Sequence, residues 1–210
     1  MSGAAEAPAA AAERIAAAAT TRRVIIGIAG PPGSGKSTVA ELLVDALRAR
    51  GVRAVAVPMD GFHLSDAVLE HLGRMGRKGA PETFDVDGYV ELLRRIRSGS
   101  ARTIYAPGFE RTLEQPIAAA IAVEPEAEVI VTEGNYLLLD DGGWREVAAE
   151  LDECWYVDTA DAPRRERLRR RHEEFGKSPE EAAGWVDDVD EPNADLVRST
   201  RHRATHHIEN

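Results

Sequence analysis

One nine-residue segment near the start of the chain has the residue types needed to hold the phosphates of a nucleotide. It reads Gly30, Pro31, Pro32, Gly33, Ser34, Gly35, Lys36, Ser37 and Thr38, and it fits the P-loop pattern. Glycines let backbone N–H groups approach the phosphates closely, the lysine neutralises the outer phosphates, and the hydroxyl that follows it binds Mg²⁺. The segment therefore predicts a site for a nucleoside triphosphate together with Mg²⁺.

Two acidic residues follow apolar runs that are predicted to be strands. Asp60 comes after the run at residues 52–57, and Glu133 comes after the run at 129–132. Ligands of doubly wound sheets gather at the carboxyl ends of the strands, so both carboxylates are expected to converge on the phosphates. Asp60 is placed to accept or orient the proton of a substrate hydroxyl and to bind Mg²⁺ through water, and Glu133 to support the Mg²⁺ or bind the substrate. The alternative is that each carboxylate only caps the turn after it.

The hydrophobic periodicity predicts the elements that position these residues. Five short apolar runs predict strands at residues 24–29, 52–57, 129–132, 154–158 and 205–208. Helical spacing predicts helices at residues 37–50, 86–97, 162–175 and 179–197. The polar, glycine-rich stretch 60–100 is expected to supply loops over a substrate site. Strands alternating with helices predict an α/β fold, a three-layer P-loop NTPase sandwich around a five-stranded parallel sheet.

Size and composition indicate one domain with small-molecule partners. The chain has 210 residues, 43% of them apolar, and we expect one domain over residues 23–210 after an alanine-rich extension at 1–22, with a helix at 9–19. A net charge of −10 argues against nucleic acid or an anionic membrane as the main partner. The single cysteine, Cys154, predicts no intrachain disulfide, and no run is long enough to span a membrane, so a cytoplasmic protein is expected. A homodimer stays open.

Four further segments, in chain order, resemble one enzyme family. They are Pro58-Met59-Asp60-Gly61-Phe62-His63, the stretch Arg77 to Asp85, Ile104-Tyr105-Ala106-Pro107, and the stretch Ile130 to Tyr136. With the P-loop they resemble the superfamily of uridine kinases, phosphoribulokinases and bacterial pantothenate kinases, from about residue 23 to 208. Residues 185–204 are similar to the end of the pantothenate kinases. Because Ala106-Pro107-Gly108-Phe109 replaces a histidine-containing segment of those enzymes, the short nucleoside kinase-like members, some associated with sugar phosphorylation, look closer.

The resemblance implies an ATP-dependent kinase whose acceptor is a hydroxyl of a small metabolite: a nucleoside, a sugar or a pantothenate-like molecule. It implies that Lys36 and Ser37 serve ATP and Mg²⁺, and that Asp60 is the catalytic carboxylate, with Lys36 and Glu133 in support. Substrate contacts are expected from Lys78, Tyr105, Glu133, Tyr136 and Asn193, and from His63, for which a structural hydrogen bond is the alternative. The arginine-rich helix at 162–175 would be a lid whose Arg167, Arg170 and Arg171 reach the ATP phosphates. A solvated charged face is the alternative for any one of these arginines.

Other functions stay open at the level of sequence. A nucleoside monophosphate kinase would need cations for the acceptor's phosphate, for which Arg74, Arg77 and Lys78 are candidates. A nucleotide sensor or a simple ATPase would keep Lys36 but would have no need of Asp60. A GTP-hydrolysing switch is disfavoured, because the chain has no Asn-Lys-x-Asp segment to read the guanine base.

Overall fold

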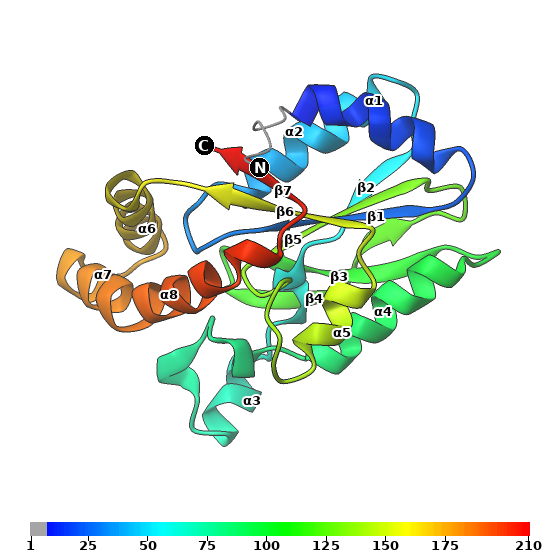
Figure 1. Ribbon diagram of the computed structural model, residues 1–210. Helices are drawn as coiled ribbons and strands as arrows, with labels where there is room; N and C mark the ends of the chain where they lie inside the picture. The colour runs from blue at the N-terminus through cyan, green and yellow to red at the C-terminus, as the bar shows by residue number, and fades with distance from the viewer. Residues whose placement is uncertain (1–7) are drawn as a thin grey trace.

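The computed structural model describes residues 8–210 and is built around a parallel sheet of five strands (Figure 1). The strands are β1 (Val24–Ala29), β2 (Ala54–Ala56), β5 (Val129–Gly134), β6 (Glu153–Asp158) and β7 (His206–Glu209). They lie in the order β2-β5-β1-β6-β7, and every neighbouring pair is parallel. The predicted α/β fold and its five parallel strands are confirmed. Since β5 lies between β1 and β2, the carboxyl ends that carry the P-loop, Glu133 and Asp60 are next to one another.

Helices cover both faces of this sheet and make three layers (Figure 1). On one face lie α1 (Pro8–Ala19) and α2 (Lys36–Arg48), and on the other lie α4 (Val86–Ser98) and α5 (Trp144–Ala149). The alternating side chains of β1 divide between the two layers: Ile26 and Ile28 pack with the first pair of helices, and Ile25 with the second. All six residues of β1 are therefore buried, which explains why its sequence is an unbroken apolar run.

The alanine-rich start contributes to the core through α1. Ala11, Ala12 and Ile15 are at most 1% exposed, and they belong to the same apolar cluster as Leu43 and Leu47 of α2. The helix predicted at residues 9–19 is thus present, and it shares a core with the domain predicted to begin at residue 23.

Three helices after β6 form what we call the helical arm, residues 161–199. They are α6 (Asp161–Glu174), α7 (Pro179–Trp185) and α8 (Glu191–Ser199), and a π-helical turn at Val186–Asp190 joins α7 to α8. The sequence predicted one continuous helix at 179–197, and the π-helical turn divides it. Such turns insert an extra residue and are frequent at functional sites. The arm lies at one end of the sheet, beyond the carboxyl end of β6 (Figure 1).

A hairpin between α4 and β5 was not predicted. Its strands are β3 (Ile104–Glu110) and β4 (Gln115–Val123), which pair antiparallel. The run of alanines in β4 favours a helix by intrinsic propensity, and pairing with β3 overrides that preference. The stretch expected to be loops also contains α3 (Asp66–His71) and three short 3₁₀ turns, η1 (Met59–Phe62), η2 (Met75–Arg77) and η3 (Pro81–Thr83).

Candidate active site

The P-loop connects the end of β1 to the start of α2. Gly33 and Gly35 have φ angles of 76° and 91°, in the left-handed region that glycine adopts without strain. Gly35 directly precedes α2, so the positive end of the helix dipole lies at the loop. The hydroxyl of Ser34 is buried and has no hydrogen-bond partner within the described part of the chain. An unpaired buried donor beside a helix N-terminus fits a cradle for phosphate oxygens.

Lys36 holds a buried positive charge in this cradle. Its side chain is 8% exposed in the fold, and its Nζ donates to the carbonyl oxygen of Pro31 at 3.1 Å. Burial lowers the pKa of Lys36 to about 8, while the carboxylates of Glu133 and Asp60 raise it. No ion pair found among residues 8–210 involves Lys36. The ammonium group is therefore available to a bound anion.

Two carboxylates and a hydroxyl lie beside this lysine. The hydroxyl of Ser37 donates to Glu133 Oε1 at 3.0 Å, and Asp60 lies in η1 directly after β2. Burial, with the neighbouring charge of Asp60, raises the pKa of Glu133. Within residues 8–210, no cluster of three or more histidine, cysteine or acidic side chains could hold a metal. A hydroxyl with one or two carboxylates is the kind of site that binds Mg²⁺ in company with phosphate oxygens.

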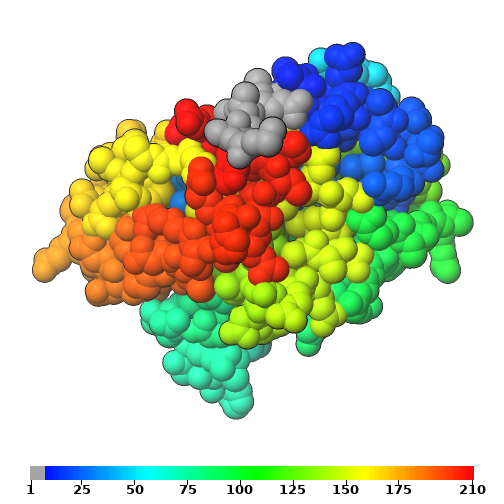
Figure 2. Space-filling model, viewed as in Figure 1, coloured from blue at the N-terminus to red at the C-terminus, as the bar shows by residue number. Residues whose placement is uncertain are grey.

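These groups line one end of a cavity of about 530 Å³. The wall nearest η1 and the β3–β4 hairpin is aromatic: the ring of His63 lies 4.0 Å from that of Phe84 and 4.9 Å from that of Phe109, between centroids. Burial lowers the pKa of His63, whose Nδ1 contacts the backbone oxygen of Asp60 at 2.9 Å. The helical arm supplies the opposite wall, with Arg171, His172, Phe175, Lys177, Trp185, Asp190 and Asn193. Figure 2 shows the arm meeting the segment around α3 at the surface.

Most of the predicted site residues come together in this cavity. Those that line it are Pro32, Gly33, Lys36, Ser37, Asp60, His63, Lys78, Glu133, Arg171 and Asn193. Lys78 is already neutralised, because its Nζ lies 2.6 Å from Asp66 Oδ1 and also donates to the backbone oxygen of Glu114. Its contact with a substrate remains a proposal.

Two predicted substrate residues lie outside the cavity lining. Tyr105 is 61% exposed on β3, and Phe109 of the same strand lines the cavity in its place. Residues four apart share a face in a regular strand, but the register of the hairpin shifts between Ala106 and Gly108, and such bulges re-aim side chains. Tyr136 is buried, and its hydroxyl donates to the backbone oxygen of Gly79, so it supports the cavity wall from behind.

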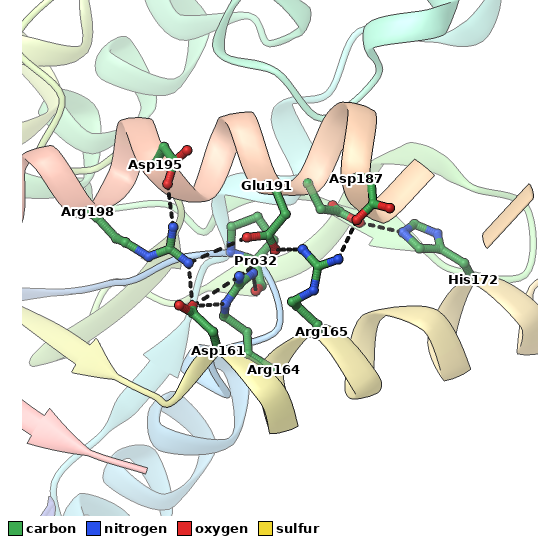
Figure 3. A network of polar contacts seen from close by, with 10 residues as sticks. Pro32, Asp161, Arg164, Arg165, His172, Asp187, Glu191, Asp195 and Arg198 are labelled. Atoms are coloured by element: carbon green, nitrogen blue, oxygen red, sulfur yellow. Dashed lines mark hydrogen bonds and ion pairs between the residues drawn. The ribbon is translucent and has the colours of Figure 1, made fainter. Parts of the chain in front are cut away.

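The arginines of α6 differ in what they contact. Arg171 lines the cavity, whereas Arg170 is exposed and Arg167 makes a long contact of 3.5 Å to the backbone oxygen of Gly33. The fully buried arginine is Arg164, which was not predicted. It donates to the carbonyl oxygen of Pro32 at 3.2 Å and pairs with Glu191 and Asp161 (Figure 3). It thereby connects the P-loop, α6 and α8.

We expect Arg164→Met to lower the free energy of unfolding by about 3 kcal/mol, because removing one partner of a buried ion pair leaves the other uncompensated. The value lies at the low end for such pairs since Glu191 keeps its contacts with Arg165 and Arg198. The neighbouring Arg165 provides a matched control: it is partly exposed and pairs with Asp187 as well as Glu191, and Arg165→Met should cost less than about 1 kcal/mol. Urea unfolding followed by circular dichroism measures both, and equal losses would contradict the prediction.

The arm wall contains residues that sequence analysis missed. His172 Nε2 lies 2.7 Å from Asp190 Oδ2, and this pair joins α6 to the π-helical turn. Trp185 lines the cavity, with Lys177 Nζ 4.6 Å from its ring centroid. The sequence held one signal for this wall: Asp190 and Asn193 are three residues apart, a spacing that places both on one helical face.

Comparison with known proteins identifies the family. Residues 25–195 match the family described as "Phosphoribulokinase / Uridine kinase family". The chain belongs to this family. A Schizosaccharomyces pombe protein provisionally named a uridine kinase is 38% identical over 160 residues, or 72% of this chain and 67% of that protein. A pantothenate kinase of Leifsonia xyli subsp. xyli is 35% identical over 138 residues, or 64% of this chain and 42% of that enzyme.

A solved structure supports the same family assignment. A crystal structure from Silicibacter sp. TM1040, provisionally named a fructose transport system kinase, has a TM-score of 0.82 and 35% identity, and the match covers 92% of this chain and 98% of that one. The predicted superfamily and P-loop fold are confirmed. The chain is an ATP-dependent phosphotransferase with a hydroxyl acceptor, that is, a small-molecule kinase of the uridine kinase and phosphoribulokinase family. None of the helices within residues 8–210 is long and apolar enough to cross a bilayer.

Proposed function

We propose that this kinase transfers the γ-phosphoryl group of Mg·ATP to a hydroxyl of a polyhydroxyl metabolite, a free sugar or the sugar of a nucleoside. The observation that carries the proposal is the convergence of Lys36, Ser37, Asp60 and Glu133 at one end of a single cavity. Its remaining walls combine aromatic faces with buried hydrogen-bonding groups. This combination of apolar surface and a few polar groups is typical of small-molecule sites.

The phosphate end is formed by the P-loop. Lys36, the N–H groups of the loop and the N-terminus of α2 bind the phosphates, and Arg171 adds a second cation from the arm. The hydroxyl of Ser37, with Asp60 and Glu133 acting through water, would hold Mg²⁺. The ion would supply positive charge that neutralises the phosphates.

The acceptor end is formed by η1, the hairpin and the arm. Asp60 accepts or orients the proton of the attacking hydroxyl. Asp190 and Asn193, at most 7% exposed, are suited to hydrogen-bond the other hydroxyls of the acceptor, and Phe84 and Phe109 offer apolar faces to its ring. The names of two relatives, a uridine kinase and a fructose transport system kinase, refer to molecules that carry sugar hydroxyls. The matches cover 67% and 98% of those chains against 42% of the pantothenate kinase, which supports a sugar acceptor over a pantothenate-like one.

An acceptor that already carries a phosphate has less support. Arg74 and Arg77 are absent from the cavity lining and contact Glu82, through its backbone oxygen and its carboxylate respectively. Lys78 pairs with Asp66. The three cations that the sequence suggested for an acceptor phosphate therefore all contact other groups of the protein.

The test is a panel of acceptors. The purified protein is incubated with Mg·ATP and pentoses, hexoses, nucleosides, nucleoside monophosphates or pantothenate, ADP is followed, and products are identified by mass spectrometry. We expect one sugar or nucleoside to gain the mass of a single phosphoryl group, at a strongly reduced rate in the Asp60→Asn variant. ADP formation at the same rate with and without every acceptor would contradict the proposal and indicate an ATPase, and transfer to monophosphates alone would indicate a nucleotide kinase.

A further inference from the structure

Arg111 reaches the reacting end of the cavity from an element that carried no predicted site arginine. It lies in the turn between β3 and β4, its side chain is 43% exposed, and it lines the same cavity as Lys36 and Asp60. Its Nη2 is 3.8 Å from Asp60 Oδ2. The two side chains form an ion pair, but at this distance they form no hydrogen bond, so Asp60 does not fix the guanidinium in one position.

Three elements of the fold each contribute one cation to this cavity. Lys36 belongs to the P-loop, Arg171 to the arm and Arg111 to the hairpin, and all three line the cavity. The charges of Arg171 and Arg111 each lower the pKa of Lys36, by less than its burial does, so both guanidinium groups lie near enough to act on the ammonium group. Within residues 8–210, Arg171 takes part in no ion pair and Arg111 takes part only in the loose one with Asp60. Like charges gathered in this way favour an anion at their centre.

The position of the three cations indicates which anion this is. Lys36 binds the outer phosphates of the nucleotide, and Asp60 orients the attacking hydroxyl on the proposed function, so the phosphoryl group passes between them. Arg111 contacts Asp60 and therefore lies beside that path, on the hairpin wall, whereas Arg171 comes from the arm wall. A planar guanidinium matches the charge that spreads over the oxygens of a transferring phosphoryl group.

We propose that Arg111 is a catalytic residue that donates hydrogen bonds to the oxygens of the γ-phosphoryl group during its transfer. This inference rests on the proposed kinase function. In the step, the bond from the phosphorus to the oxygen of ADP breaks, a bond to the acceptor oxygen forms, and the hydroxyl proton passes to Asp60. Arg111 forms and breaks no covalent bond and stays protonated throughout.

The test uses ADP, Mg²⁺ and aluminium fluoride, a mimic of the phosphoryl group in transit that needs no identified acceptor. Calorimetry measures the affinity for Mg·ADP with and without the fluoride complex in the wild type, Arg111→Gln and Arg111→Lys. Arg102→Gln is the matched control, since Arg102 is an exposed arginine two residues before β3 and is absent from the cavity lining. We expect aluminium fluoride to strengthen binding by about 10²-fold or more in the wild type and in Arg102→Gln.

Arg111→Gln should keep the affinity for Mg·ADP and lose most of that gain, and Arg111→Lys should keep part of it through its charge. An unchanged gain in Arg111→Gln would overturn the inference while leaving the kinase function intact. Loss of Mg·ADP binding itself would also overturn it, because Arg111 would then serve the nucleotide or the fold. If aluminium fluoride does not strengthen Mg·ADP binding in the wild type, and the wild type phosphorylates no acceptor, the proposed kinase function itself is contradicted. With a known acceptor, a raised KM at constant kcat would assign Arg111 to acceptor binding instead.

Discussion

Asp60→Asn is expected to lower kcat for phosphoryl transfer by about 10²- to 10⁴-fold, the usual cost of removing a positioned acid or base. The asparagine has nearly the same shape, so the turn at Met59–Phe62 and the neighbouring His63 keep their contacts. What is lost is the ability to accept the hydroxyl proton. The loose ion pair with Arg111 at 3.8 Å is also lost, but its contribution to stability is small at a side chain that is 28% exposed.

The measurement separates binding from chemistry. Single-turnover rates with the acceptor found in the panel give the chemical step, and calorimetry gives the affinity for Mg·ATP, which should change little. The control is Asp45→Asn, which removes an exposed carboxylate from α2, and it should retain full activity. An Asp60→Asn enzyme with wild-type kcat would refute the assigned role. A variant that lost Mg·ATP affinity and kept its chemical rate would leave Asp60 with a role at the metal alone.

The phosphate end of the site was predictable because its signals are local. The P-loop is contiguous, and its glycines, lysine and hydroxyl have fixed roles whatever the rest of the chain does. Asp60 and Glu133 could be placed because each follows a buried strand, and parallel strands bring their carboxyl ends to one edge. The register confirms this geometry: Glu133 lies opposite Ile28 of β1, one residue before that strand ends.

The acceptor end depends on irregular features that residue patterns do not reveal. A regular strand would place Tyr105 and Phe109 on one face, and a bulge separates them. The alanine-rich sequence of β4 does not indicate a strand, so neither the hairpin nor the position of Arg111 in its turn could be predicted. The π-helical turn that positions Asp190 has no sequence signature that the analysis could use.

One missed feature of the arm could have been found from helical periodicity. Leu168 is the buried apolar residue of α6, and Arg164 and Arg171 are four residues before it and three after it. Positions spaced by three and four residues share a face, so both arginines should point inward with Leu168. Arg170 lies on another face and is exposed. The pattern thus distinguishes the arginines that the resemblance alone grouped together.

Lys36→Met is expected to abolish detectable turnover and to weaken Mg·ATP binding, because the thioether fills the space of the lysine stem without its charge. The lysine is buried beside two carboxylates, so the variant removes a positive charge that offsets the negative charges of Glu133 and Asp60. Thermal unfolding should therefore be compared first, to show that the variant is folded at the assay temperature. A matched variant is Lys177→Met on the arm wall, which should bind Mg·ATP as the wild type does.

The lowered pKa of Lys36 also predicts how nucleotide affinity depends on pH. Below about pH 8 Lys36 of the free protein is already protonated, so nucleotide binding needs no further proton. Above about pH 8 Lys36 is mostly neutral, and it must take up one proton for each nucleotide that binds. Affinity should then fall by about tenfold for each pH unit above that value. Lys36→Arg, charged throughout, should bind with constant affinity from about pH 7 to about pH 9.5. Calorimetry across this range tests the assignment, and a parallel fall in Lys36→Arg would trace the titration to another group.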